Sequence, residues 1–314
     1  MDERRIGPSG LKVSIVGLGC NNFGGRVDFE GTKRVVHKAL DLGITLFDTA
    51  DMYGNRGGSE TLLGRVMGDR RKDIVLATKV GWAMRDDGRM QGGSRRYIMQ
   101  AVEDSLRRLQ TDWIDLYQLH RPDPMTPIEE TLRAFDDLIH QGKVRYIGCS
   151  NLPAWQVMDA QWTSRHWNLN RFICCQDEYS LLVRNIEREL VPAIEAQGLG
   201  LLPFFPLASG MLTGKYRRGT AAPTGTRLAG SQGLADRFMS DPNLRTMERL
   251  EQVAKERGHT LLDLAFGWLL SHPVIPSVIA GATKPEQLEA NVNAAGWRLT
   301  ADDRAAVDAA CQGQ

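Results

Sequence analysis

Four side chains that can carry proton-transfer chemistry stand at or just beyond the ends of three apolar segments of the chain. These side chains are Asp48, Tyr53, Lys79 and His120. Each segment is rich in β-branched and other apolar residues, which is typical of a short buried strand. One polar residue at a strand end is most simply a solvated terminus. Four of them at three successive strand ends favour a shared site.

A carboxylate, an amine and a phenol in one site can support proton transfer to a carbonyl group. A buried Lys79 requires a counter-ion, and Asp48 is the obvious one. We expect the lysine cation to lower the pKa of the Tyr53 phenol from its reference value of about 10, making it a better proton donor to a developing alkoxide. His120 could polarise a carbonyl or orient the substrate. The set contains no metal-ligand cluster and suits hydride addition to a carbonyl, which requires a cofactor.

A repeating pattern of strand and helix determines where these residues lie. Eight apolar segments are each followed by sequence with helical spacing, as in parallel β/α units. The segments are 14–19, 44–48, 73–80, 113–120, 144–149, 172–176, 199–204 and 277–280. Eight units in succession predict a closed (β/α)8 TIM barrel, an α/β fold with its site at the carboxyl ends of the strands, as one domain over residues 1–314.

Three further segments have their own signals. Residues 6–13 place turn residues between two extended pieces, which predicts an N-terminal β-hairpin that caps one end of the barrel. Residues 52–58 are Gly-rich and are expected to form a loop. Residues 206–242 predict a long loop at the carboxyl-terminal face, and such a loop in a compact domain is usually functional.

An open, doubly wound sheet is the alternative fold. Such a sheet more often carries a dinucleotide fingerprint in its first turn. Residues 17–22 lack the third glycine of that fingerprint, and the following helix begins too late to offer its N-terminus to a pyrophosphate. The barrel is therefore the favoured fold.

Composition argues against several classes of function. The chain has 314 residues, of which 42% are hydrophobic and 25% charged, with a formal net charge of +1. It therefore lacks the electrostatic footprint of a nucleic-acid-binding or anionic-membrane-binding protein. No apolar stretch approaches the length needed to span a bilayer, so a cytoplasmic protein is expected. The five cysteines show neither a paired framework nor metal-ligand spacing and are expected to be reduced.

The sequence resembles the aldo-keto reductase family over nearly its whole length. The resemblance is carried by Gln176 and by the motifs at residues 17–19, 47–54, 115–120, 142–151, 206–216 and 281–287. It implies a β/α barrel that binds an extended nicotinamide cofactor, usually the phosphorylated one, and reduces aldehydes and ketones or oxidises alcohols. It makes Tyr53 the proton donor, Asp48 and Lys79 its support, and His120 the orienting group.

The resemblance also implies a set of cofactor contacts. Those at the nicotinamide end are Ser150, Asn151 and Gln176 for the carboxamide and Phe204 for stacking on the ring. Those along the pyrophosphate are Leu207, Gly210, Lys215 and Arg227, and those around the adenosine are Gly281, Thr283, Lys284, Gln287 and Asn291. The set also includes Gly19, Cys20, Asn21, Phe205 and Pro206. From the residues alone, Phe204 is as readily a core residue and Ser150 with Asn151 a helix cap.

Two positions depart from the family pattern. Two other positions bear on whether the cofactor is NADPH or NADH. Phe205 stands where many members have a serine, and Ala290 where many have an acidic residue. Thr283 and Lys284 begin a helix near the expected 2′-phosphate, which predicts NADPH over NADH. Thr283 could alternatively cap that helix in a capping box.

The expected substrate is a small carbonyl or alcohol compound, because Phe23, Trp82 and the loop after Lys79 would give an apolar and aromatic pocket. Two other functions use the same barrel. Lys79 could be the Schiff-base nucleophile of an aldolase. The chain could also be a nicotinamide-binding regulatory subunit, since some relatives of the family serve as channel partners.

Overall fold

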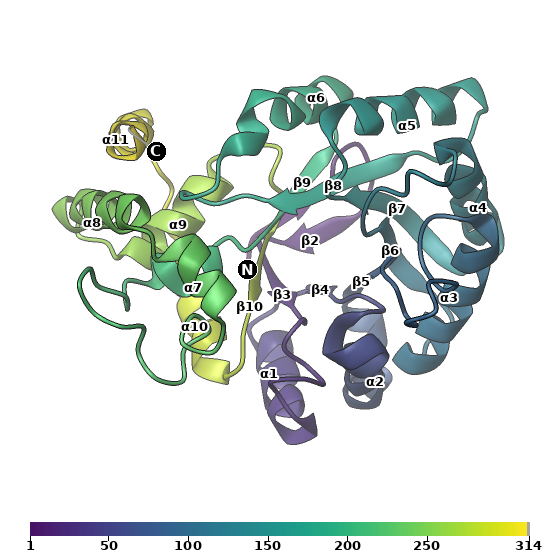
Figure 1. The fold of residues 1–314 in the computed structure, drawn as a ribbon, viewed down its shortest axis with the longest axis horizontal. Coiled ribbons are helices and arrows are strands. Elements are labelled where there is room, and N and C mark those ends of the chain that lie inside the picture. Colours follow the sequence, from purple (N-terminus) through teal and green to yellow (C-terminus); the bar gives the residue numbers. More distant parts are fainter. Residues whose placement is uncertain (313–314) are drawn as a thin grey trace.

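Eight parallel strands form a nearly closed barrel in the computed structural model, which describes residues 1–312 (Figure 1). The strands are β3 (Val16–Gly19), β4 (Leu46–Asp48), β5 (Val75–Val80), β6 (Ile114–Leu119), β7 (Val144–Ser150), β8 (Phe172–Glu178), β9 (Gly200–Phe204) and β10 (Val278–Gly281). Their order in the sheet is β10-β3-β4-β5-β6-β7-β8-β9. Near the gap between β9 and β10, the N–H of Leu201 donates to the carbonyl of Val274 at 2.7 Å. The predicted (β/α)8 barrel is confirmed, with a strand in each of the eight predicted segments.

The α-helices lie outside the ring of strands (Figure 1). They are α1 (Phe29–Asp41), α2 (Tyr53–Met67), α3 (Arg95–Leu109), α4 (Ile128–His140), α5 (Ala154–His166), α6 (Leu190–Gln197), α7 (Gln232–Phe238), α8 (Asp241–Glu256), α9 (Leu261–Leu270), α10 (Pro285–Ala294) and α11 (Ala301–Cys311). In α1, Val35, Val36 and Ala39 are buried because they recur at helical spacing on one face. The side chain of Ser94 accepts a hydrogen bond from the N–H of Tyr97 and so caps α3.

The predicted N-terminal hairpin is present and closes the end of the barrel at which the strands begin. Strands β1 (Glu3–Arg5) and β2 (Lys12–Ser14) pair antiparallel. Ile6 and Val13 are fully buried and pack with side chains from several barrel strands. At Gly7, with φ 51°, a Cβ atom would lie 2.3 Å from the carbonyl oxygen of Ile173, so only glycine fits this contact.

Two segments differ from the expected loops. Residues 54–57 all have positive φ and form a tight left-handed turn at the start of α2, directly after Tyr53. The segment 206–242 contains a 3-10 helix, η3 (Ala208–Thr213), and α7. Their side-chain patterns are too short to distinguish a single helical turn from a loop.

Helix α11 is an addition to the predicted elements. It buries only Val307, Ala310 and Cys311, so its apolar periodicity is weak. Thr300 and Asp303 form a capping box at its start. Across residues 1–312, the structure contains no helix of the length and apolarity that a membrane crossing requires.

Candidate active site

The carboxyl ends of β4, β5 and β6 bring together three of the four candidate residues. Asp48 is the last residue of β4, Lys79 lies in β5, and His120 directly follows β6. Lys79 Nζ donates to Asp48 Oδ2 at 2.6 Å and to the carbonyl oxygen of Thr49 at 2.9 Å. Both side chains are removed from water, since Lys79 is 0% and Asp48 4% exposed. The predicted ion pair is therefore formed, and it is buried.

Two amide side chains complete the environment of Asp48. Gln176 Nε2 and Gln118 Nε2 donate to Asp48 Oδ1 at 2.9 and 3.3 Å. Gln118 is absent from the predicted site, and Gln176 was expected to serve only the cofactor. Three donors from three strands therefore hold one carboxylate, which satisfies a buried charge and fixes its orientation.

Tyr53 lies beside the ion pair, but its acidity differs from the expectation. Lys79 Nζ is 5.1 Å from the centroid of the Tyr53 ring. Burial raises the pKa of Tyr53, Lys79 lowers it, Asp48 raises it, and the net result is a pKa above its ordinary value. The expected net lowering was wrong because burial disfavours the phenolate more than the lysine favours it. Tyr53 is therefore protonated at neutral pH, the state that a proton donor requires.

His120 is held as a neutral imidazole. Burial, with the charges of Lys79 and Arg121, lowers the pKa of His120 to about 2. Its ring packs edge-on against Tyr53, with centroids 5.7 Å apart and planes at 83°. Its Nδ1 is buried and has no hydrogen-bond partner within residues 1–312. A neutral imidazole can donate one hydrogen bond to a substrate oxygen, which agrees with an orienting role.

One large cavity opens above these residues, with a volume of about 770 Å³. Asp48, Tyr53 and His120 line it, whereas Lys79 lies behind Asp48 and does not. All of the predicted cofactor residues also line it, namely Gly19, Cys20, Asn21, Ser150, Asn151, Gln176, Phe204, Phe205, Pro206, Leu207, Gly210, Lys215, Arg227, Gly281, Thr283, Lys284, Gln287 and Asn291. Residues at or just beyond the ends of β3, β4, β6, β7, β8, β9 and β10 thus line one cavity, and its volume suits a small-molecule ligand.

The backbone after β9 is strained where it borders this cavity. Phe205, Ala208 and Ser209 have φ values of 49°, 45° and 57°. Non-glycine residues rarely adopt such angles, and they concentrate at functional sites. The Ser209 hydroxyl is buried, lines the cavity and has no hydrogen-bond partner among the described residues. Ser209 was not predicted, although its position between Leu207 and Gly210 is a signal that could have found it.

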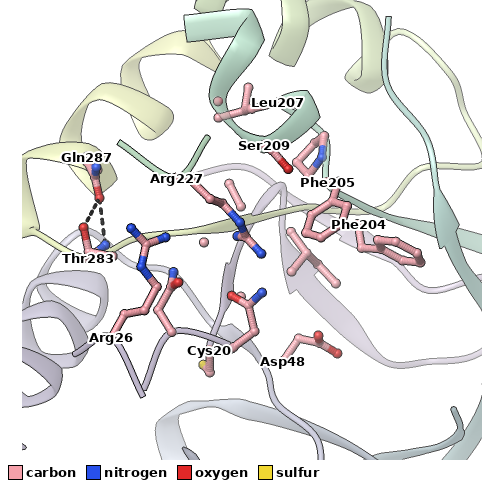
Figure 2. Close-up of a pocket in the computed structure, with 18 of the residues that line it drawn as sticks. Cys20, Arg26, Asp48, Phe204, Phe205, Leu207, Ser209, Arg227, Thr283 and Gln287 are labelled. Atoms are coloured by element: carbon pink, nitrogen blue, oxygen red, sulfur yellow. Dashed lines mark hydrogen bonds between the residues drawn. The ribbon is translucent and has the colours of Figure 1, made fainter. Parts of the chain in front are cut away.

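Arg26 lines the cavity close to two other cations, Lys215 and Arg227, and was not predicted from the sequence. Figure 2 shows the guanidinium groups of Arg26 and Arg227 turned toward each other. Burial and the charge of Arg26 lower the pKa of both Lys215 and Arg227. Within residues 1–312, none of the three forms an ion pair with a carboxylate, and Arg227 lies 4.9 Å over the ring of Phe205. Arg26 could have been found from its place in the loop after the first barrel strand.

At the far end of the cavity, Gln287 organises the start of α10. Its Oε1 accepts hydrogen bonds from the backbone N–H and the hydroxyl of Thr283 at 2.7 and 3.3 Å (Figure 2). It also accepts one from the backbone N–H of Lys284 at 3.3 Å. The N-cap residue is Lys284. The alternative role of Thr283 as the helix cap is therefore wrong, since the side chain of Gln287 satisfies these donors.

The expected substrate wall is half correct. Trp82 lines the cavity, packs edge-on against His120 with centroids 6.1 Å apart, and lies under the Arg121 guanidinium at 4.5 Å. Phe23 does not line it, because its side chain is 0% exposed and belongs to the core. The spacing of apolar residues in the sequence cannot distinguish a residue that lines a cavity from one in the core behind it.

Comparisons with known proteins agree with this arrangement. The model of the aldo/keto reductase family matches residues 15–312. The chain is 38% identical over 301 residues to a probable voltage-gated potassium channel subunit beta of Arabidopsis thaliana, covering 94% of this chain and 91% of that protein. It is 34% identical over 303 residues to an L-glyceraldehyde 3-phosphate reductase of Escherichia coli (strain K12), covering 94% and 87%.

Proposed function

The chain belongs to the aldo/keto reductase family as an oxidoreductase-type member, and on that basis we propose that it interconverts small carbonyl compounds and alcohols with NADP(H). The observation that carries the proposal is the single cavity that joins Tyr53 and His120 at one end to Thr283 and Lys284 at the other. A protonated phenol, a neutral imidazole and unpaired cations along one channel suit a carbonyl group next to an anionic cofactor.

The residues along the cavity fit an extended nicotinamide dinucleotide. Ser150 and Asn151 offer polar groups at the catalytic end, and Phe204 offers an aromatic face. Three cations and the hydroxyl of Ser209, which have no carboxylate or hydrogen-bond partner, respectively, among residues 1–312, are groups that phosphate oxygens would satisfy. When bound, the reduced nicotinamide supplies the hydride, which no side chain of this site can provide.

The side chains of this chain carry the proton half of the reaction. The Tyr53 hydroxyl donates its proton to the carbonyl oxygen as the substrate becomes an alcohol. Neutral His120 donates a hydrogen bond that orients the same oxygen. The tyrosinate that remains is stabilised by the cation of Lys79, and Asp48 holds that cation in place. In alcohol oxidation the same proton returns to Tyr53.

A panel of aldehydes and ketones with NADPH and with NADH tests the proposal. We expect cofactor-dependent turnover of one or more small carbonyl compounds, followed by the change in nicotinamide absorbance. Tight binding of NADPH without turnover of any substrate would contradict the enzymatic proposal.

That negative result would favour a second candidate, a nicotinamide-binding regulatory subunit. The identity of 38% with a protein named as a potassium channel subunit beta supports this candidate. The aldolase alternative has less support, because Lys79 is fully buried and its amine is held by Asp48 away from the cavity. Burial lowers the pKa of Lys79, but Asp48 and Tyr53 raise it more, so the amine stays a cation and is a poor nucleophile.

We predict that NADPH binds more tightly than NADH and that Lys284→Ala removes most of the difference. Lys284 is exposed at the start of α10, where a 2′-phosphate would meet a cation and a helix N-terminus. A charge-assisted hydrogen bond corresponds to roughly tenfold in affinity. Fluorescence titration with each cofactor measures the effect, with Lys33→Ala on α1 as the matched control. Equal or tighter binding of NADH to the unmodified protein would contradict the prediction.

We also predict that Arg26→Gln weakens NADPH binding by about tenfold at low salt and by less at high salt. Arg26 lies close enough to Arg227 and Lys215 to lower the pKa of both, and no carboxylate of the described residues pairs with any of the three, so a bound pyrophosphate would relieve their repulsion. For the same reason, the cofactor-free variant should be at least as stable as the unmodified protein in a thermal melt. Arg34→Gln, an exposed arginine of α1, is the control. A variant that binds NADPH normally would show that Arg26 is only a solvated cation.

A further inference from the structure

A second buried cluster of acidic residues lies behind the proposed active site. Asp51 and Glu60 are both 0% exposed. Glu60 accepts a hydrogen bond from Arg108 Nε at 2.7 Å and another from the Thr78 hydroxyl at 2.6 Å. Asp51 has no ion pair with any of the residues that the structure describes. The cation of Arg108 is thus committed to Glu60, and an ionised Asp51 would be a buried charge with no cation paired to it among the described residues.

Asp51 is therefore a neutral carboxylic acid at neutral pH. Burial first, and the nearby Glu60 second, raise the pKa of Asp51 to about 8. A neutral carboxyl group can donate a hydrogen bond, whereas a carboxylate can only accept one. The two protonation states of Asp51 consequently make different demands on its neighbours.

The hydrogen bonds of the Tyr97 hydroxyl on α3 depend on whether Asp51 is protonated. It lies 3.3 Å from Asp51 Oδ2 and 3.4 Å from the carbonyl oxygen of Trp82. One hydroxyl proton cannot serve both acceptors well. With Asp51 protonated, Asp51 donates to Tyr97 and Tyr97 donates to Trp82. With Asp51 ionised, Tyr97 turns its proton to the carboxylate, and the Trp82 carbonyl loses its donor.

Both ends of this chain of hydrogen bonds adjoin the site. Trp82 lines the cavity and packs against His120. Asp51 lies two residues before Tyr53, and its backbone N–H donates to the carbonyl of Lys79 at 3.2 Å. We propose that Asp51 is a positioning residue that acts through Tyr97, holding Trp82 in the substrate wall while its carboxyl group is protonated and releasing it when that group ionises.

Several titratable groups are close to Asp51. Those that face it are Glu60 from α2, Tyr97 and Arg108 from α3, and Tyr117 from β6. Among the proposed catalytic groups, the pKa of His120 is about 2, and the pKa values of Tyr53 and Lys79 lie above their ordinary values. A transition near pH 8 in substrate binding would therefore report Asp51.

A first experiment measures the substrate KM as a function of pH. This experiment requires the proposed reductase function, whereas the second experiment below does not. We expect the KM of a carbonyl substrate to rise by about fivefold through pH 8 in the unmodified protein, the size of one net hydrogen bond. Asp51→Asn, whose amide donates at every pH, should keep the low KM throughout. Tyr97→Phe, which cannot hold Trp82, should have the high KM throughout. Tyr117→Phe removes a neighbouring buried hydroxyl and should keep the normal profile.

A second arm uses the protein without cofactor or substrate. The difference in fluorescence between the unmodified protein and Trp82→Phe isolates the emission of Trp82. This difference should change with a midpoint near pH 8 and should lose that change in the Asp51→Asn and Tyr97→Phe backgrounds. Such a result in a protein without reductase activity would overturn the proposed function and support the role of Asp51. An active enzyme whose transition persists in Asp51→Asn would overturn the role of Asp51.

Discussion

Tyr53→Phe should reduce kcat by on the order of 10²- to 10⁴-fold, the usual contribution of a general acid, while NADPH affinity changes by no more than a few-fold. The hydroxyl contributes only where the carbonyl oxygen takes up a proton, so its removal affects the transition state and not the dinucleotide complex. The ring of phenylalanine preserves the packing against His120.

Single-turnover kinetics and a fluorescence titration of NADPH separate the two effects. Tyr146→Phe is the matched control, because it removes the hydroxyl of a tyrosine that packs with the cluster at the hairpin end of the barrel. If Tyr53→Phe retained most of its activity while Lys79→Met lost all of it, Tyr53 would not be the proton donor. The Schiff-base alternative would then have to be reconsidered despite the burial of Lys79.

Lys79→Met should both abolish activity and destabilise the fold. Removing one partner of a buried ion pair costs about 3–5 kcal/mol, because the other charge remains in the interior. In this protein Asp48 would be left with the amides of Gln118 and Gln176 as its side-chain donors. The pKa of Lys79 is raised above its ordinary value of 10.5. The contribution of the Lys79 cation to the free energy of unfolding is therefore fully present below pH 10.5 and is lost only as the pH rises through the raised pKa. The destabilisation should therefore be the same throughout the neutral range.

Urea unfolding of a double-mutant cycle measures this effect. Adding Asp48→Asn to Lys79→Met removes the isolated charge and should recover most of the lost stability without recovering activity. The amide oxygen of the new asparagine can still accept the hydrogen bonds of Gln118 and Gln176. An equal loss of stability in the single and double variants would show that the charge of Asp48 is not the cause.

The sequence alone was sufficient to predict the eight strand segments and the four polar residues at or just beyond the ends of three of them. These signals are local, since apolar runs, helical spacing and a terminating polar residue lie within one short segment. Because the carboxyl ends of parallel barrel strands meet on one face, the approach of Lys79 to Asp48 followed from these local signals once the barrel was assumed.

Only the tertiary structure decided which side chains form hydrogen bonds with the site residues. It also decided whether burial or a neighbouring charge has the larger effect on their pKa values. Gln176 reaches Asp48 across 128 positions of the chain, and no local pattern encodes that contact. The pKa of Tyr53 is raised, whereas the sequence predicted that it would be lowered, because burial disfavours the phenolate more than Lys79 favours it. Arg26 and the hydrogen bonds from Asp51 through Tyr97 depend in the same way on loops and helices that meet only in the folded chain. Residue type specifies which interactions are possible, whereas packing selects the partner and the local dielectric that decide which of them forms.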